Sequence, residues 1–143
     1  MKHTFVAPNS DGLIRKCDAS GCGHFGANRI GHKHNGVDFV VIPNQNIYAP
    51  FPCIINRYGY PYSGDLNYRL IEIIGTGAYQ AYRAKIMYIN EVLPVKSRLD
   101  KGDALCTADD ITKKYDTPMT PHVHFELYIN NKLVDPTKYF NVK

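Results

Sequence analysis

The chain has 143 residues, of which 44% are hydrophobic and 21% are charged. These values match an ordinary globular protein and indicate neither a disordered chain nor a fibrous repeat. No run approaches eighteen apolar residues, so a membrane-spanning helix is not expected. The net charge of +4 is dispersed and forms no basic run, so nucleic acid is not an expected partner.

Short strands separated by turns make up most of the predicted secondary structure. The expected strands are rich in β-branched and aromatic residues and cover residues 36–42, 46–48, 53–58, 68–74, 79–89, 122–129 and 132–134. Turns are predicted at residues 59–64, 75–77, 101–103 and 130–131, the last an Asn-Asn pair that favours a tight hairpin.

Helix signals are few. Residues 89–93 are compatible with one turn of helix, and residues 107–115 with a short irregular or helical link. We therefore expect a mainly β fold with little helix, in which antiparallel strands curl into a partly open barrel or sandwich. The length predicts one domain that covers residues 1–143.

Two short segments carry four groups that can bind a metal or transfer protons. His34 and Asp38 lie four residues apart, and His122 and His124 lie two apart. Side chains at these spacings on an extended backbone point to the same face, so each pair faces one spot. Either pair alone is weak evidence, because alternate histidines on a strand are more often surface or hydrogen-bonded residues. The prediction of a metal site rests on both pairs together.

Zinc is the metal that these side chains favour. An open zinc site has three protein ligands drawn from histidine nitrogen and carboxylate oxygen, whereas a closed structural site is usually rich in cysteine. His34, Asp38 and His124 would form such an open site for Zn²⁺. His122, one strand repeat from a ligand, would then act as the general base.

Further motifs extend this pattern along the chain. His34 and Asp38 are followed by Tyr48-Ala49-Pro50, Lys101-Gly102-Asp103, His122-x-His124-Phe125-Glu126 and Val134-Asp135-Pro136. From about residue 30 to residue 140 their order and spacing resemble the lysostaphin-type zinc peptidases. The resemblance implies a zinc-dependent metalloendopeptidase that cleaves peptide cross-bridges of peptidoglycan, with His34, Asp38 and His124 as zinc ligands and His122 as a catalytic residue.

Position 88 departs from that family. Active members usually carry a second catalytic histidine in a Tyr-x-His-Leu strand before the Lys-Gly turn, and Tyr88 stands at that place here. A phenol can donate a hydrogen bond to a developing oxyanion, so we predict a catalytic role for Tyr88 in a slower enzyme. The alternative is an ordinary strand tyrosine beside a silent site. The nearby tyrosines of residues 58–62 would either line a groove or pack across strands.

The amino-terminal segment carries a second resemblance. Cys17-Asp18-x-x-Gly21-Cys22-Gly23-x-Phe25-x-Ala27-x-Arg29, followed by His34-x-Gly36-Val37-Asp38, resembles the leukocyte-derived chemotaxin branch of the same superfamily. That branch is secreted, binds zinc, is not known for robust proteolysis and also has tyrosine at the position of Tyr88. It implies the alternative function, a catalytically silent, zinc-stabilised binding or signalling module that recognises an extracellular glycan or receptor.

Cysteine spacing bears on the compartment. Cys17 and Cys22 enclose four residues, which favours a small-loop disulfide over a redox motif or a zinc ribbon. Cys53 and Cys106 are either a second bridge or two buried thiols. We expect an oxidising location, secreted or periplasmic, although residues 1–8 lack the apolar stretch of a signal peptide.

Several polar side chains are candidates for supporting roles. Glu126 and Asp135 are predicted to bind the outer ring nitrogens of the ligand histidines and so fix their tautomers. His32 would line the cleft or replace a ligand, while His3 and His24 are expected at the surface.

Overall fold

Antiparallel strands form most of this computed structural model, which describes residues 5–143; His3 lies outside them. The strands are β1 Asn28–Arg29, β2 His32–Lys33, β3 Val37–Val40, β4 Asn46–Tyr48, β5 Cys53–Gly59, β6 Arg69–Gly75, β7 Tyr82–Asn90, β8 Arg98–Leu99, β9 Ala104–Ala108, β10 His122–Ile129 and β11 Lys132–Val134. Three short 3₁₀ helices are η1 Gly77–Tyr79, η2 Ile111–Lys114 and η3 Thr137–Tyr139.

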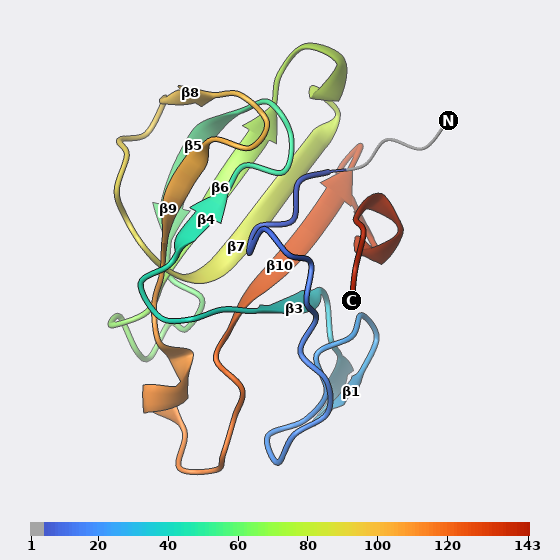
Figure 1. The fold of residues 1–143 in the computed structure, drawn as a ribbon, viewed down its shortest axis with the longest axis vertical. Coiled ribbons are helices and arrows are strands. Elements are labelled where there is room, and N and C mark those ends of the chain that lie inside the picture. Colours follow the sequence, from blue (N-terminus) through green and yellow to red (C-terminus); the bar gives the residue numbers. More distant parts are fainter. Residues whose placement is uncertain (1–4) are drawn as a thin grey trace.

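Nine of the strands form one twisted sheet (Figure 1). Its main path runs β11-β10-β7-β6-β5-β8, while β3 pairs with the first half of β10 and β9 joins β4 to the end of β7. All pairs are antiparallel and the path does not close, which confirms the predicted mainly β, partly open fold. None of the helices in residues 5–143 is long and apolar enough to span a membrane.

Strand β10 shows how the sequence pattern separates the core from the site. Its alternate residues Val123, Phe125 and Leu127 are fully buried in the apolar core with residues from β3, β5, β6 and β7. Because side chains alternate across a strand, His122, His124 and Glu126 project from the opposite face of the same strand. One strand therefore anchors itself in the core and presents polar groups on its other side.

All seven predicted strands are present: three have the predicted ends, and in the other four one or both ends differ by one to three residues. The predicted hairpin at residues 130–131 is confirmed: Asn130 and Asn131 have φ values of 52° and 64°, the left-handed conformation that a two-residue type I′ turn requires. The predicted helical turn at residues 89–93 is wrong. There β7 continues to Asn90 because β9 offers it a partner strand, and β9 escaped prediction since alanine is a weak strand former.

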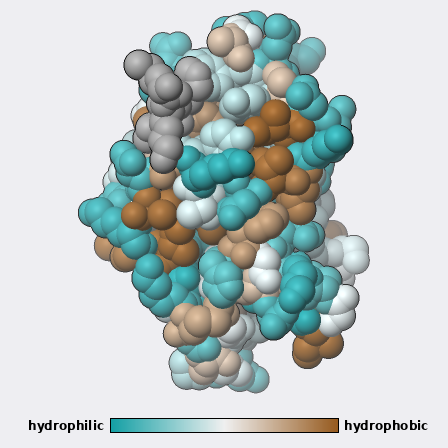
Figure 2. Space-filling model, turned by 90° about the vertical axis from the view of Figure 1, so that its right-hand side faces the viewer, coloured by the Kyte–Doolittle hydropathy of each residue, from teal (hydrophilic) through white to brown (hydrophobic). Residues whose placement is uncertain are grey.

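Two loop regions extend from the same end of the sheet (Figure 1). One contains the β1–β2 hairpin and the other the segment from η2 to the start of β10. The link predicted for residues 107–115 contains η2, which is its helical part. On the face shown in Figure 2 the apolar side chains lie in separate groups among hydrophilic ones.

Candidate metal centre

Three predicted ligands meet at one point beneath these loops. Nε2 of His34 lies 2.9 Å from Nδ1 of His124, and each of these atoms lies 3.2 Å from Oδ1 of Asp38. All three side chains are buried. Ligand atoms 2.0–2.2 Å from a tetrahedral zinc lie about 3.3–3.6 Å from one another. The triangle is therefore close to the size that zinc requires.

Strand pairing explains this convergence. Asp38 on β3 is the direct cross-strand partner of His124 on β10, and cross-strand partners on one face have adjacent side chains. Gly36 lets the chain before β3 pass close to β10, because a Cβ there would lie 2.2 Å from the carbonyl oxygen of Phe125 and 2.9 Å from the ring of His124. His34 can thereby reach the same point from the preceding turn.

Hydrogen bonds on the outer sides of the rings fix which nitrogen faces the centre. Nδ1 of His34 lies 2.9 Å from the carbonyl oxygen of His24, and Nε2 of His124 lies 2.8 Å from a carboxylate oxygen of Glu126. Carbonyl and carboxylate oxygens only accept, so these outer nitrogens carry the protons. In neutral rings the inner nitrogens then point lone pairs at each other and at Asp38, an arrangement that needs a shared cation. The residues present fit Zn²⁺.

Without a metal, a proton meets that need. Burial alone would lower the pKa of His124, but hydrogen bonds to Asp38 and Glu126 raise it to about 9. Burial alone would raise the pKa of Asp38, but its hydrogen bonds with His124 and His34 keep that pKa below its usual range. His124 is thus the imidazolium ion at neutral pH in the metal-free protein.

We expect zinc binding at pH 7.5 to release about one proton, since the metal must displace the proton of His124. Apparent zinc affinity should rise up to about tenfold per pH unit from pH 6.5 to pH 9, the pKa of His124. Isothermal titration calorimetry in buffers of different ionisation enthalpy measures the protons released. At pH 10 the release should vanish, and binding at pH 7.5 without proton release would contradict the expectation.

His122 lies beside the ligand triangle and outside it. Its Nε2 is 3.5 Å from Oδ2 of Asp38, and its Nδ1 is 2.8 Å from the carbonyl oxygen of Thr120. Because that carbonyl accepts, Nδ1 carries the proton and Nε2 keeps a lone pair facing the site. Burial lowers the pKa of His122, so its ring stays neutral and able to accept a proton at neutral pH.

Tyr88 stands at a break in the strand pairing. Arg69 pairs with Ile89 and the next residue of β6 pairs with Met87, so Tyr88 is the extra residue of a β-bulge. Its φ of 75° is a strained conformation for an aromatic residue, and such strain is concentrated at functional sites. The bulge places its ring edge-to-face with His122, with 5.6 Å between ring centres.

Two more tyrosines continue from Tyr88 along the cavity wall. The hydroxyl of Tyr62 lies 3.0 Å from that of Tyr88 and 2.9 Å from that of Tyr115. Burial raises the pKa of Tyr88, so its hydroxyl remains protonated and able to donate. Of the tyrosines in residues 58–62, Tyr62 alone lines this cavity, which bears out the predicted groove for one member of the run.

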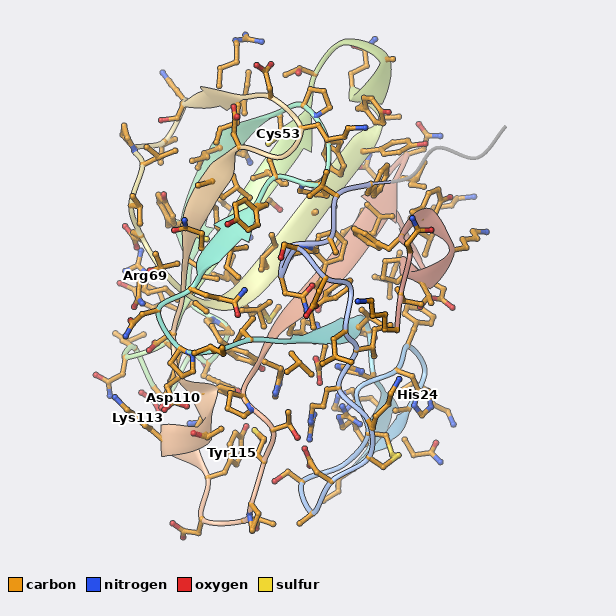
Figure 3. All side chains as sticks on the ribbon, in the orientation of Figure 1. His24, Cys53, Arg69, Asp110, Lys113 and Tyr115 are labelled. Atoms are coloured by element: carbon orange, nitrogen blue, oxygen red, sulfur yellow. A yellow bond between two sulfur atoms is a disulfide. The ribbon has the colours of Figure 1, made fainter. Side chains whose placement is uncertain are left out.

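The cavity above the ligands has a volume of about 310 Å³. His32 lines it without joining the ligand triangle. A neighbouring cavity of about 650 Å³ shares Arg29, His32 and Tyr115 with it, so the two cavities adjoin. Figure 3 shows Tyr115 on one loop region and His24 on the other.

Sequence reasoning missed Arg15, which is buried with 3% of its surface exposed and donates from Nη1 to Oδ2 of Asp38 at 2.8 Å. A signal was present in its spacing to Asp18, three residues on, but arginine–aspartate pairs at that spacing are common on surfaces. The supporting role predicted for Glu126 agrees with its contact to His124. Asp135 instead accepts a hydrogen bond from the backbone N–H of Thr137.

The predicted small-loop disulfide is present. Cys17 and Cys22 form a disulfide. Cys53 and Cys106 are free and buried, so the alternative of two buried thiols is confirmed. Burial, followed by the nearby charge of Asp103, raises the pKa of Cys53 to about 12, which keeps this group in the unreactive thiol form.

Known proteins resemble the chain in two ways. No protein-family model matches it. It is 33% identical over 135 residues to leukocyte cell-derived chemotaxin-2 of Bos taurus, which covers 93% of this chain and 83% of that protein. The antimicrobial peptidase lysostaphin from Staphylococcus simulans matches with a TM-score of 0.68 and 18% identity, over 98% of this chain and 54% of that one. A zinc containing peptidase from Vibrio cholerae matches with a TM-score of 0.67 and 17% identity, over 99% and 41%.

The structural matches to peptidases and the sequence match to the chemotaxin support different conclusions. The chain spans about half of lysostaphin and about two fifths of the Vibrio cholerae protein, and at such low identity these matches establish the fold. The chemotaxin match is higher in identity and runs through most of both proteins. The chain therefore belongs to the leukocyte cell-derived chemotaxin-2 family and has the lysostaphin-type peptidase fold.

Proposed function

We propose that the chain is a zinc-dependent endopeptidase that cleaves peptide cross-bridges of peptidoglycan, as one domain acting outside the cytoplasm. The observation that carries the proposal is the convergence of His34, Asp38 and His124 with a fourth group, His122, whose lone pair faces the same cavity. In a closed structural site four protein ligands fill the coordination positions, so a neighbouring group able to accept a proton would have no water molecule to act on. The disulfide and the chemotaxin-type relatives support an extracellular location.

His34, Asp38 and His124 would hold the metal. Bound there, zinc supplies a Lewis acid that polarises a carbonyl group and acidifies a water molecule. Nε2 of His122 accepts the proton of the attacking water, because Nδ1 is committed to Thr120 and burial keeps the ring neutral. The hydrogen bond to Thr120 also holds the ring in one orientation while it receives the proton.

Tyr88 donates a hydrogen bond to the oxyanion that develops on the scissile carbonyl. Its bulge turns the side chain toward His122, and its raised pKa keeps the donor proton in place. Tyr62 accepts or donates at the same hydroxyl, which orients the phenol before substrate arrives. A phenol donates without carrying the positive charge of an imidazolium, so we expect slower turnover than in peptidases with histidine at this place.

The test is digestion of purified peptidoglycan that contains several types of cross-bridge. The zinc-loaded chain is incubated with it, with and without a chelator, and soluble products are identified by mass spectrometry. We expect new peptides that disappear with the chelator and return when zinc is restored. A zinc-loaded chain that releases no peptide from any cross-bridge type would reject the endopeptidase.

Substitution of Tyr88 by phenylalanine should slow peptide release about 10²–10³-fold, the usual effect of losing one oxyanion donor. Zinc content should not change, because the hydroxyl of Tyr88 contacts Tyr62 and none of the three ligands. The rate is followed by chromatography of the released peptides. Tyr115→Phe is the matched control, since Tyr115 bonds Tyr62 at the far end of the chain of hydroxyls. Equal rates for wild type and Tyr88→Phe would remove Tyr88 from the mechanism.

A second candidate function is a silent binding or signalling module in which zinc stabilises the fold and the cavity recognises an extracellular glycan or receptor. It is favoured by the 33% identity to a chemotaxin. In that case the chelator would lower the melting temperature while no cross-bridge is cut. The same digestion, run beside a thermal melt, separates the two functions.

A further inference from the structure

Arg15 reaches the metal centre from outside the strands that carry the ligands. Its guanidinium donates from Nη1 to Oδ2 of Asp38 at 2.8 Å, and from Nε and Nη2 to the carboxylate of Asp18 at 2.9 and 2.8 Å. The planar fork of arginine can hold two carboxylates at fixed angles, which the single ammonium of lysine cannot. Arg15 thus ties one ligand to a second acidic residue.

Asp18 links Arg15 to Thr120, the residue that holds the ring of His122. Besides Arg15, its carboxylate accepts from the backbone N–H groups of Ser20 and Thr120, at 2.8 and 2.9 Å. The carbonyl oxygen of the same Thr120 receives the hydrogen bond from Nδ1 of His122. One pair of side chains therefore contacts both a predicted ligand and the residue that orients the predicted base.

The backbone of this amino-terminal segment is fitted to β3 as closely as its side chains. The N–H of Arg15 donates to the carbonyl of Asp38 at 2.8 Å, and the N–H of Asp38 donates to the carbonyl of Gly23 at 2.9 Å. A Cβ at position 23 would lie 2.6 Å from the carbonyl oxygen of Arg15 and 3.1 Å from Cβ of Asp38. The segment that contains the disulfide loop covers the edge of β3 that β10 leaves open.

We propose that Arg15 is a positioning residue that restricts Asp38 to binding metal through Oδ1 alone, and that Asp18 couples this restriction to the orientation of His122. The inference rests on the metal centre of the proposed function. Asp38 has two oxygens, and a free carboxylate can bind a cation through both. Arg15 occupies Oδ2, so Oδ1 would be the oxygen left to hold a metal, and the metal would keep a position free for substrate.

The principal test replaces Arg15 by lysine in the full chain. We expect Arg15→Lys to bind zinc about 10–100-fold more weakly, the usual effect of losing a partner of a metal ligand. In the cobalt-substituted protein the visible absorption should weaken, because four-coordinate cobalt(II) absorbs more strongly than cobalt of higher coordination number. The spectrum reports coordination, which a purely structural role of Arg15 would leave unchanged. Arg57→Lys is the matched control: Arg57 pairs with Glu72 at 3.0 Å, away from the ligands.

A second variant tests the coupling and guards against poor folding of the first. Asp18→Asn keeps the shape of the side chain but loses its charge, and it should weaken zinc binding in the same direction. If Arg15 and Asp18 act as a unit, the double variant that carries both Arg15→Lys and Asp18→Asn will bind zinc no more weakly than the single variant with the lower affinity. Independent, fully additive losses would overturn the coupling through Asp18. Circular dichroism and urea unfolding of each variant show whether it is folded.

The outcomes separate this inference from the proposed function, because no readout here needs a substrate. If the wild type binds zinc and cobalt while Arg15→Lys matches it in affinity and spectrum, the inference fails and the proposed function stands. If the wild type binds neither ion, both fail. Weaker binding with an altered cobalt spectrum in Arg15→Lys, but not in Arg57→Lys, supports the positioning role.

Discussion

Asp38→Ala is expected to abolish stoichiometric zinc binding and to destabilise the chain by about 3–5 kcal/mol, the usual cost of breaking a buried ion pair. Asp38 is 1% exposed and is the residue on which the site depends most. It contributes a predicted ligand oxygen between two histidines, and it neutralises Arg15 at 2.8 Å. Without it, Asp18 is the only acidic side chain left in contact with Arg15 among the described residues.

Zinc content by elemental analysis and urea unfolding with and without zinc measure both effects. In the wild type, zinc at about 1,000 times its dissociation constant should add about 4 kcal/mol to the free energy of unfolding, and in Asp38→Ala this increment should disappear. Asp65→Ala is the control, since Asp65 pairs with Lys114 at the surface and its loss should leave zinc content unchanged. Full zinc occupancy in Asp38→Ala would refute the proposed ligand set.

His122→Ala is expected to keep zinc and lose hydrolysis, with a fall of about 10²–10⁴-fold for the loss of a general base. The two effects separate because His122 contacts a different oxygen of Asp38 from the ligand histidines. Its Nε2 lies 3.5 Å from Oδ2, whereas His34 and His124 approach Oδ1. Rates of peptide release and zinc content are measured on the same preparation. His32→Ala is the matched control, because His32 lines the same cavity from an exposed strand.

The pH profile gives an independent check on His122. The base must be neutral, and burial lowers its pKa, so hydrolysis by the wild type should hold below pH 6.5, the ordinary value for histidine, before it declines with further acidification. The His122→Ala protein should lose this acidic limb. Equal rates of cleavage by wild type and His122→Ala would exclude His122 as the base.

Local sequence patterns were sufficient for part of this structure. Alternation in residues 122–129 predicted a strand with two histidines on one face, and Asn130-Asn131 predicted the turn that ends it. Both depend on interactions within a few residues. The predicted barrel or sandwich followed from many short strands with turns between them.

Features set by distant residues escaped prediction. Tyr88 lies in a bulge because β6 and β7 differ by one residue in their pairing, and no property of residue 88 alone encodes that difference. Arg15 reaches Asp38 across 23 positions of sequence, through a segment whose path is set by its pairing with β3. Strand β9 likewise forms because β4 and β7 offer it partners.

The pairing of residues 13–23 with β3, and of β3 with β10, bears on the order in which the chain folds. These pairings bring His34 next to His124, although the two are far apart in the sequence. Contacts so remote in sequence form late, because most of the intervening chain must first collapse. We expect a metal that requires all of these contacts to be captured after the rate-limiting step of folding. Zinc would accordingly lengthen the lifetime of the native state by slowing its unfolding, while the speed of refolding stays the same.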